Sequence, residues 1–207
     1  MAIERLFIKE GIKESQVEKF LSQRFEKAGY SHTLIQRTPL GTRIIVYANK
    51  PGLVIGRSGR RIKELTDEIK EKFGFENPMV DVREVDQPFL DSIIVADRVA
   101  KALEKGVNYK KVVNYYLESV MQAGATGIQI KVAGKLGGEK SRFQKFKQGY
   151  IKHSGGYSDT MVEKGQAQAM LRQGIVGVEV KIMKGSAKEF ILKKEIEKKD
   201  ETIEAQG

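Results

Sequence analysis

The segment GLVIGRSGRRIKEL, residues 52–65, constrains the fold of this chain more than any other stretch. Gly56 and Gly59 stand with two residues between them, so the backbone can turn there without the restriction that a Cβ atom imposes. Apolar residues then recur at intervals of three and four, the spacing of a helix that buries one face. These residues are Ile62, Leu65, Ile69 and Phe73. The segment therefore predicts a tight turn followed directly by an amphipathic helix, which Gly74 ends.

Patterns on either side of this turn predict a small α+β domain. A helix is expected from Ser15 to about Lys27, because the apolar residues there share one stripe and serine is a good N-cap. Residues 32–38 and 42–48 are rich in β-branched and aromatic side chains and are separated by Pro-Leu-Gly, which predicts a β-hairpin. Residues 78–85 alternate apolar and charged side chains, as a strand does.

The charges at the turn favour a bound phosphate backbone. Arg57, Arg60 and Arg61 flank the glycines, and Ser58 adds a hydroxyl donor. The first N–H groups of the following helix and the positive end of its dipole attract anions at the same place. Since glycine lets a sugar-phosphate chain approach the main chain closely, we expect residues 56–61 to bind RNA.

The turn also has a purely structural interpretation, in which the glycines only join two helices and the arginines are solvated. The neighbouring apolar residues favour RNA binding over this alternative. Val54 and Ile55 before the turn and Ile62 after it can anchor both helices on a sheet, which leaves the turn itself exposed.

The charge balance of the chain agrees with a polyanionic partner. Its 207 residues include 37 Lys and Arg against 27 Asp and Glu, a formal charge of +10, which favours RNA, DNA or an acidic membrane surface. There is no cysteine and only two histidines, so a disulfide framework is excluded and a zinc site is disfavoured. No stretch reaches the roughly 20 apolar residues of a membrane span. We expect a cytoplasmic protein with no cofactor, metal, membrane partner or small-molecule substrate.

Two further helices are predicted over residues 88–106 and 108–125, joined at Gly106. The first is expected to bury Phe89, Ile93, Ala96, Ala100 and Leu103, and the second Val112, Val113, Tyr116, Leu117 and Val120. On the second helix Lys110, Lys111 and Asn114 share the polar side. This side is suited to RNA, although such lysines are also common on a solvated helix face.

The second half also contains two predicted half-buried strands, residues 126–133 and 175–183, with a basic region between them. Residues 134–156 hold six Lys or Arg and one Glu. We expect an RNA-facing loop there, because so one-sided a charge run would otherwise repel itself. The cations expected to contact RNA are Lys135, Lys140, Arg142, Lys145 and Lys147. The aromatic residues among them, Phe143, Phe146 and Tyr150, can either stack on bases or pack under the loop.

Two segments near the end of the chain are less informative. Residues 160–172 alternate like a strand but have a helix-forming composition, so the sequence assigns them no element. Residues 187–207 are charged with almost no aromatic anchor, which predicts a mobile tail or a helix that orders on a partner.

These motifs resemble known families at two levels. Residues 15–87 resemble a type II KH domain, whose GXXG loop clamps about four nucleotides of single-stranded backbone. Over residues 5–186 the chain resembles the small-subunit ribosomal protein S-three family, and the segment FIKEGIKESQVEKFL looks like its archaeal and eukaryotic branch. The motifs that carry this resemblance are KPGLVIGRSGRRIKEL, GATGIQIKVAGKLGGEKSR and RQGIVGVEVKIMKG.

The resemblance implies a structural role in the head of the small ribosomal subunit, bound to its ribosomal RNA beside the channel where messenger RNA enters. It implies neighbouring head proteins of the S-ten and S-fourteen families. Family members carry a basic cluster that faces incoming messenger RNA and contributes to unwinding, which corresponds here to Lys110 and Lys111. Asn114 departs from that pattern by replacing a basic residue.

We therefore predict an α+β chain of two domains. A KH type II domain, residues 15–87, has a three-stranded sheet with helices on one face, and a second domain, residues 88–186, has two helices packed on a mostly antiparallel sheet. Residues 1–14 form an N-terminal segment, and residues 187–207 are the charged tail.

Two other functions fit parts of the sequence. A free-standing KH regulator of messenger RNA fits the first domain but leaves the second basic domain without a purpose. A nuclease or lyase needs paired carboxylates for a metal or a lysine nucleophile beside an acid. The sequence offers only Asp81, Glu84 and Asp86, which are better explained as solvated charges, and it has no ATP-binding loop. We expect no enzymatic activity.

Overall fold

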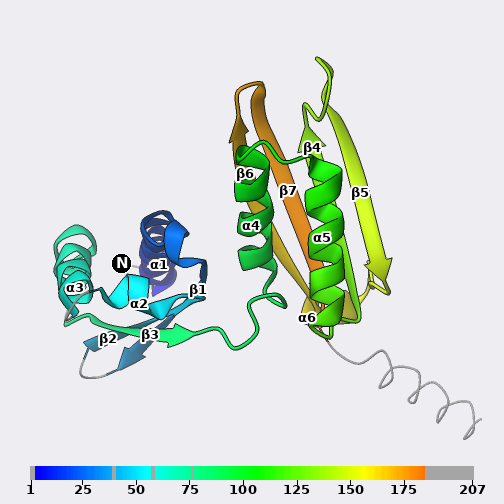
Figure 1. The fold of residues 1–207 in the computed structure, drawn as a ribbon. Coiled ribbons are helices and arrows are strands. Elements are labelled where there is room, and N and C mark those ends of the chain that lie inside the picture. Colours follow the sequence, from blue (N-terminus) through cyan, green and yellow to red (C-terminus); the bar gives the residue numbers. More distant parts are fainter. Residues whose placement is uncertain (1–2, 39–40, 57–58, 76, 185–207) are drawn as a thin grey trace, which may run out of the picture. The chain divides into compact units, whose positions relative to one another are not determined.

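The computed structural model describes residues 3–38, 41–56, 59–75 and 77–184, and it divides the chain into two compact units, Met1–Pro88 and Phe89–Gly207. Figure 1 shows the elements of both units. The first unit consists of α1 (Ile3–Arg24), the 3-10 helix η1 (Glu26–Ala28), β1 (Tyr30–Thr38), β2 (Gly41–Ala48), α2 (Pro51–Ile55), α3 (Arg60–Phe73) and β3 (Met79–Glu84).

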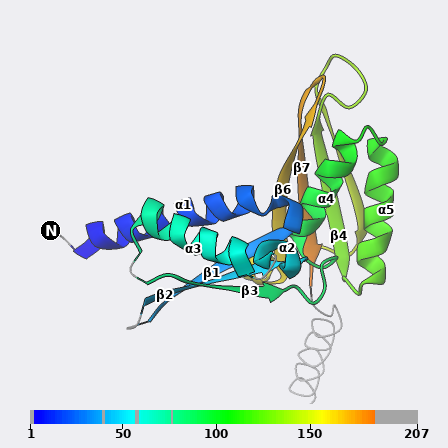
Figure 2. The same ribbon diagram turned by 60° about the vertical axis from the view of Figure 1, so that its left-hand side comes forward.

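The sheet of the first unit has the order β1-β2-β3, in which β1 pairs with β2 antiparallel and β2 pairs with β3 parallel. The helices α1, α2 and α3 lie on one face of this sheet (Figures 1 and 2). The predicted hairpin and the predicted strand after α3 are both confirmed. Gly74 ends α3 in the left-handed conformation, with its N–H donating to the Lys70 carbonyl, as expected.

The core of the first unit lies between these helices and the sheet. Its buried residues come from every element except β3, whose Val80 and Val82 are half-buried against it, because each element presents an apolar side to the same layer. They are Val17, Leu21, Phe25, Ala28, Tyr30, Ile44, Val46, Ala48, Val54, Leu65 and Ile69. Burial raises the pKa of the Tyr30 hydroxyl to about 12, and its oxygen lies 3.0 Å from the Thr33 hydroxyl.

The start of α1 differs from the prediction. The helix begins at Ile3 and has 22 residues, so Ser15 lies inside it and is not its N-cap. The added turns are held by the hairpin, since the Arg37 guanidinium of β1 pairs with both Glu10 and Glu14. Sequence periodicity cannot reveal this contact, because the partners lie on different elements.

The second unit consists of α4 (Ser92–Glu104), α5 (Tyr109–Gln122), β4 (Gly127–Gly134), β5 (Arg142–Gly149), α6 (Gly156–Met161), β6 (Val162–Leu171) and β7 (Gly174–Met183). Its four strands form one antiparallel sheet in the order β5-β4-β7-β6. Figure 1 shows α4 and α5 side by side on one face of this sheet. The predicted architecture of two helices on a mostly antiparallel sheet is confirmed.

The core of the second unit fills the layer between the two helices and the sheet. Ile128, Ile130 and Val132 of β4 are fully buried there. Most helix residues expected in the core are buried, as predicted, whereas three are half-buried. The half-buried residues are Phe89, Ile93 and Tyr116.

Two segments that the sequence left open or assigned to a loop are strands. Residues 162–171 pair along the whole length of β7 as β6. The expected basic loop is in part also a strand, since Arg142–Gly149 pairs with β4 as β5. In both cases pairing with a distant neighbour decides the structure and overrides local composition. The predicted tail, residues 187–207, lies outside the described residues.

Helix α4 lies close to β6 because of one glycine. A Cβ atom at Gly165 would come within 2.3 Å of the Ser92 carbonyl carbon and oxygen, so only glycine allows this approach.

Within the described ranges, none of the helices combines the length and the apolar character needed to cross a membrane.

Candidate nucleic-acid interface

The glycine turn joins α2 to α3, as the sequence predicted. Gly56 ends α2 with φ 70° and ψ −174°, and Gly59 precedes α3 with φ 72° and ψ 11°. Val54 is fully buried and anchors α2, and Ile62 is half-buried on α3. Ile55 is 38% exposed, so its expected role as a second anchor of α2 is wrong. A five-residue helix presents only a narrow buried side, and Val54 occupies it.

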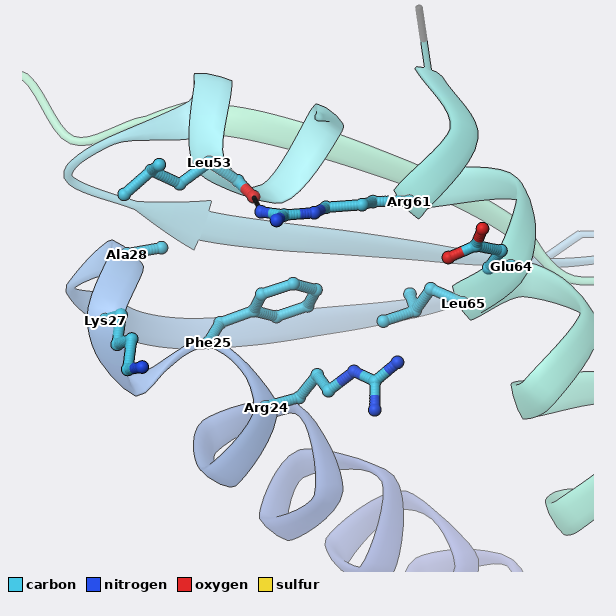
Figure 3. Close-up of a pocket in the computed structure, with 8 residues that line it drawn as sticks. All are labelled: Arg24, Phe25, Lys27, Ala28, Leu53, Arg61, Glu64 and Leu65. Atoms are coloured by element: carbon cyan, nitrogen blue, oxygen red, sulfur yellow. Dashed lines mark hydrogen bonds between the residues drawn. The ribbon is translucent and has the colours of Figure 1, made fainter. Parts of the chain in front are cut away.

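The two described arginines at the turn have different surroundings. Arg60 is exposed at the first position of α3. The Arg61 Nη1 donates to the Leu53 carbonyl at 3.0 Å, which braces α3 against α2 (Figure 3). Arg57 and Ser58 lie outside the described residues. Gly59 provides no side-chain cap and the first turn of α3 has no acidic residue, so its N–H groups are suited to an anion.

Two grooves adjoin the turn. One has a volume of about 710 Å³ and is lined by Gly52, Leu53, Gly56, Arg60, Arg61 and Glu64. The other, of about 500 Å³, lies between the end of α1 and the α2–α3 pair (Figure 3). It is lined by Arg24, Phe25, Lys27, Ala28, Leu53, Arg61, Glu64 and Leu65. Both grooves therefore combine basic side chains with apolar Leu53, and both also contain the carboxylate of Glu64.

The polar face of α5 is exposed to solvent, as the sequence predicted. Lys110, Lys111 and Asn114 are exposed, whereas Val112 and Val113 between them are buried. The helix starts at a capped turn, in which Oδ1 of Asn108 accepts from the Lys110 N–H at 3.0 Å. The face thus presents two ammonium groups and one amide on a rigid element.

The five cations expected on one basic loop do not share one surface. Lys135 and Lys140 lie in the turn between β4 and β5. Because β5 alternates, Lys145 and Lys147 point to the sheet face opposite the helices, and Arg142 points to the face that carries α4 and α5. The five predicted cations therefore lie partly in the turn before β5 and partly on the two opposite faces of the sheet.

The aromatic residues near these cations are divided in the same way. Phe146 packs against Tyr109 of α5 with ring centroids 6.5 Å apart, so the packing interpretation holds for this residue. Phe143 is 64% exposed and Tyr150 is 55% exposed, so both remain accessible to a ligand.

The acidic residues considered for a metal role have other surroundings. Asp81 accepts from Arg43 at 2.8 Å across two neighbouring strands. Glu84 and Asp86 are exposed. Among the residues that the structure describes, no three His, Cys, Asp or Glu side chains form a group that could hold a metal ion.

Comparison with known families assigns both units. Residues 16–90 match the KH domain, and residues 99–182 match the C-terminal domain of ribosomal protein S3. The KH match covers the glycine turn with the sheet and helices that support it. The second match covers the last part of α4 from residue 99, all of α5, β4, β5 and β6, and β7 up to residue 182.

Individual relatives match over most of their length. Small ribosomal subunit protein uS3 of Methanocaldococcus jannaschii is 44% identical over 207 residues, which cover 99% of this chain and 100% of that protein. The uS3 protein of Methanococcus aeolicus is 45% identical over 181 residues, 87% of each chain. That of Methanoregula boonei is 44% identical over 188 residues, 91% of this chain and 81% of the relative.

These matches confirm the family resemblance of the sequence motifs. The relatives are archaeal and are named as a ribosomal protein and not as an enzyme, so the expectation of a non-enzymatic protein is confirmed as well. The chain belongs to the family of the small ribosomal subunit protein uS3.

Proposed function

We propose that this chain is a structural, non-catalytic constituent of the small ribosomal subunit and binds the RNA of that subunit. The observation that carries the proposal is the relationship to uS3 over both units, from the first residues of α1 to the end of β7. The formal charge of +10 supports an RNA partner, because each phosphate neutralised by a lysine or arginine releases a counterion.

The glycine turn is the proposed backbone contact of the KH unit. Residues Gly56, Arg57, Ser58, Gly59, Arg60 and Arg61 hold a sugar-phosphate segment. The two glycines with positive φ, the exposed Arg60 and the uncapped start of α3 support this role. Arg61 contributes in part indirectly, since its bond to the Leu53 carbonyl fixes the two helices on either side of the turn.

The second unit contributes two further contacts. Lys110 and Lys111 on α5 face messenger RNA at the entry channel in the subunit head, and Asn114 weakens this cluster because it lacks a charge. Lys135, Lys140, Arg142, Lys145 and Lys147 face ribosomal RNA from both sides of β5. The proposal includes head neighbours of the S-ten and S-fourteen families and a cytoplasmic location.

Charge reversal at the turn tests the KH contact. Replacing Arg57→Asp and Ser58→Asp keeps both glycines but places negative charge where phosphate is proposed to lie. We expect the affinity of the full chain for a fragment of small-subunit ribosomal RNA to fall about tenfold or more, measured by fluorescence anisotropy.

A matched control separates local repulsion from the change in net charge. Lys13→Asp with Gln16→Asp makes the same change in charge on the exposed side of α1. Its affinity is expected to fall much less. An unchanged affinity of the turn variant, with circular dichroism like that of the wild-type chain, would remove the turn from the RNA interface.

A further inference from the structure

The sheet of the second unit has one face that α4 and α5 do not cover. Ile128, Ile130 and Val132 of β4 point toward the helices, so the alternate residues of β4 and their partners on the neighbouring strands point the other way. We call this the open face. Its residues are Phe143, Lys145 and Lys147 of β5, the buried Gln129 with Lys131 and Ala133 of β4, the exposed Ile175 with Gly177, Glu179 and Lys181 of β7, and Lys164, Gln166, Gln168 and the exposed Met170 of β6.

The open face carries a strong positive charge. It holds five lysines and one glutamate, a net charge of +4. Glu179 lies between two of the lysines, with Oε1 3.0 Å from Lys181 Nζ and Oε2 3.6 Å from Lys131 Nζ. Lys145 and Lys147 have no described ion-pair partner and are exposed. Such a surface is complementary to a polyanion.

An exposed aromatic ring lies among these charges. Phe143 is 64% exposed, and Nζ of both Lys131 and Lys145 lies 5.8 Å from its ring centroid. The exposed ring leaves apolar area in contact with water, and a stacked partner would remove that area from water with a gain in free energy. A nucleobase suits this position, since its flat face stacks on the ring while the adjacent ammonium groups reach phosphate.

The residues beside Phe143 on the sheet are small, so there is room for further bases. In register with Phe143 stand Ala133 on β4 and Gly177 on β7, the two smallest side chains of the open face. They form the floor of a shallow groove of about 520 Å³, with Gln166 and Gln168 along its far wall. Primary amides on the wall offer both donors and acceptors, which suit base edges.

We propose that the open face binds a single-stranded segment of RNA. One base stacks on Phe143, its neighbours lie over Ala133 and Gly177, and the phosphates contact Lys131, Lys145 and Lys147. A single strand fits better than a duplex, because only unpaired bases can stack on the ring and enter the groove. The site rests on the proposed function in one respect, since Lys145 and Lys147 are already proposed to face RNA. It is tested separately, because the free chain binds short RNA without assembly into a subunit.

The test removes the ring and fills the groove, one at a time. Phe143→Ala deletes the stacking surface, and Gly177→Leu blocks the groove. At Gly177 an added Cβ would have no neighbour closer than the Ala133 carbonyl oxygen at 3.9 Å, so the strand can accept a side chain. Both are made in the full chain that also carries Arg57→Asp and Ser58→Asp, so that the KH turn does not contribute.

The probes are a labelled single-stranded RNA of about 12 nucleotides, a duplex of the same length and a labelled polyglutamate peptide. Each open-face variant is expected to weaken single-strand binding about fivefold or more and duplex binding much less. Phe143→Tyr is expected to retain binding, because tyrosine also stacks. Controls of matched type, Phe7→Ala and Gly11→Leu on the exposed side of α1, leave the affinity unchanged.

Three results would overturn the proposal. Unchanged single-strand affinity of Phe143→Ala would exclude stacking at this ring. An equal loss for duplex and single strand would assign the face to double-stranded RNA. Tighter binding of polyglutamate than of RNA, lost in Lys145→Gln with Lys164→Gln, would assign it to an acidic protein. If Gly177→Leu fails to fold, the Phe143 variants still decide between these results.

Discussion

Gly56 and Gly59 are required for different reasons, although the sequence motif treats them alike. At Gly56 the combination of φ 70° and ψ −174° is open to glycine alone, and an added Cβ would lie 2.8 Å from Cγ and Cδ of Arg61. At Gly59 the backbone is left-handed with φ 72° and ψ 11°, and an added Cβ would meet nothing within 4 Å. Only the first position combines backbone strain with a steric clash.

Substitutions at the two glycines should therefore differ in effect. Gly56→Ala is expected to destabilise the α2–α3 region by about 1–3 kcal/mol. Gly59→Asn is expected to have little effect, because asparagine adopts the left-handed conformation readily. Hydrogen exchange of the amides in α2 and α3 measures both. Wild-type exchange rates in Gly56→Ala would contradict the strain argument.

Glu179 is the acidic residue of the open face, and its surroundings stabilise its charge. The hydrogen bond from Lys181 holds the pKa of its carboxyl below the usual value, with a further contribution from Lys131. Opposite it on β6 stands the neutral Gln166. Because the pKa is lower in the folded chain than in the unfolded one, the pairing stabilises the fold above the ordinary glutamate pKa and is lost as pH falls below it.

Glu179→Gln should therefore have an effect that depends on pH. At neutral pH we expect the variant to be less stable by at most about 1 kcal/mol, the size of a half-exposed ion pair. The difference should shrink as the pH falls below about 4, where the wild-type carboxylate takes up a proton. Urea unfolding followed by circular dichroism at several pH values measures it. A stability difference between wild type and variant that grows toward acid pH would contradict the lowered pKa of Glu179.

The sequence predicts well those elements whose own residues show a helical or strand periodicity. The hairpin of β1 and β2, the amphipathic α3 and the helices α4 and α5 each follow from the period of their own apolar residues. β5 and β6 could not be assigned in this way. Their structure depends on pairing with β4 and β7, which lie elsewhere in the sequence.

The start of α4 depends on a buried cap. Oδ1 of Asp91 accepts from the N–H groups of Ile93 and Ile94 at 2.9 and 3.1 Å, and Asp91 is only 8% exposed. Water cannot easily replace this carboxylate. By contrast, Asn108 caps α5 at an exposed position, where water can reach the same N–H group.

Removing the two caps should have unequal effects. Asp91→Ala is expected to reduce the stability of α4 by about 1–2 kcal/mol, because it leaves buried donors without an acceptor. Asn108→Ala is expected to cost about half as much. Amide exchange in the first turns of α4 and α5 gives both values, and equal losses would argue against burial as the cause.

The candidate site was predictable only where its residues are neighbours in sequence. The glycine turn and the lysine pair on α5 each lie on one element, so their positions could be stated in advance. The open face combines four strands. Alternation marks Lys131 and Lys181 as polar positions, but only the β4–β7 register brings them to the same glutamate.

At the scale of the whole molecule, both units present basic surfaces built on rigid elements. The KH unit offers the glycine turn, and the second unit offers the α5 face and the open face. A free-standing RNA regulator could work with the KH unit alone. The second unit, matched to a ribosomal domain over residues 99–182, is the stronger reason to assign the chain to the small subunit.

Sedimentation of native lysate through sucrose gradients, at low and then at high salt, shows whether the protein is part of the small ribosomal subunit. The protein is followed by quantitative mass spectrometry. We expect comigration with small subunits at one copy each. This comigration should persist at high salt, because the contacts within an assembled subunit together keep binding tight although salt weakens each phosphate contact. A protein that runs mainly free, or with messenger RNA away from the subunit, would contradict the account and favour the free-standing regulator.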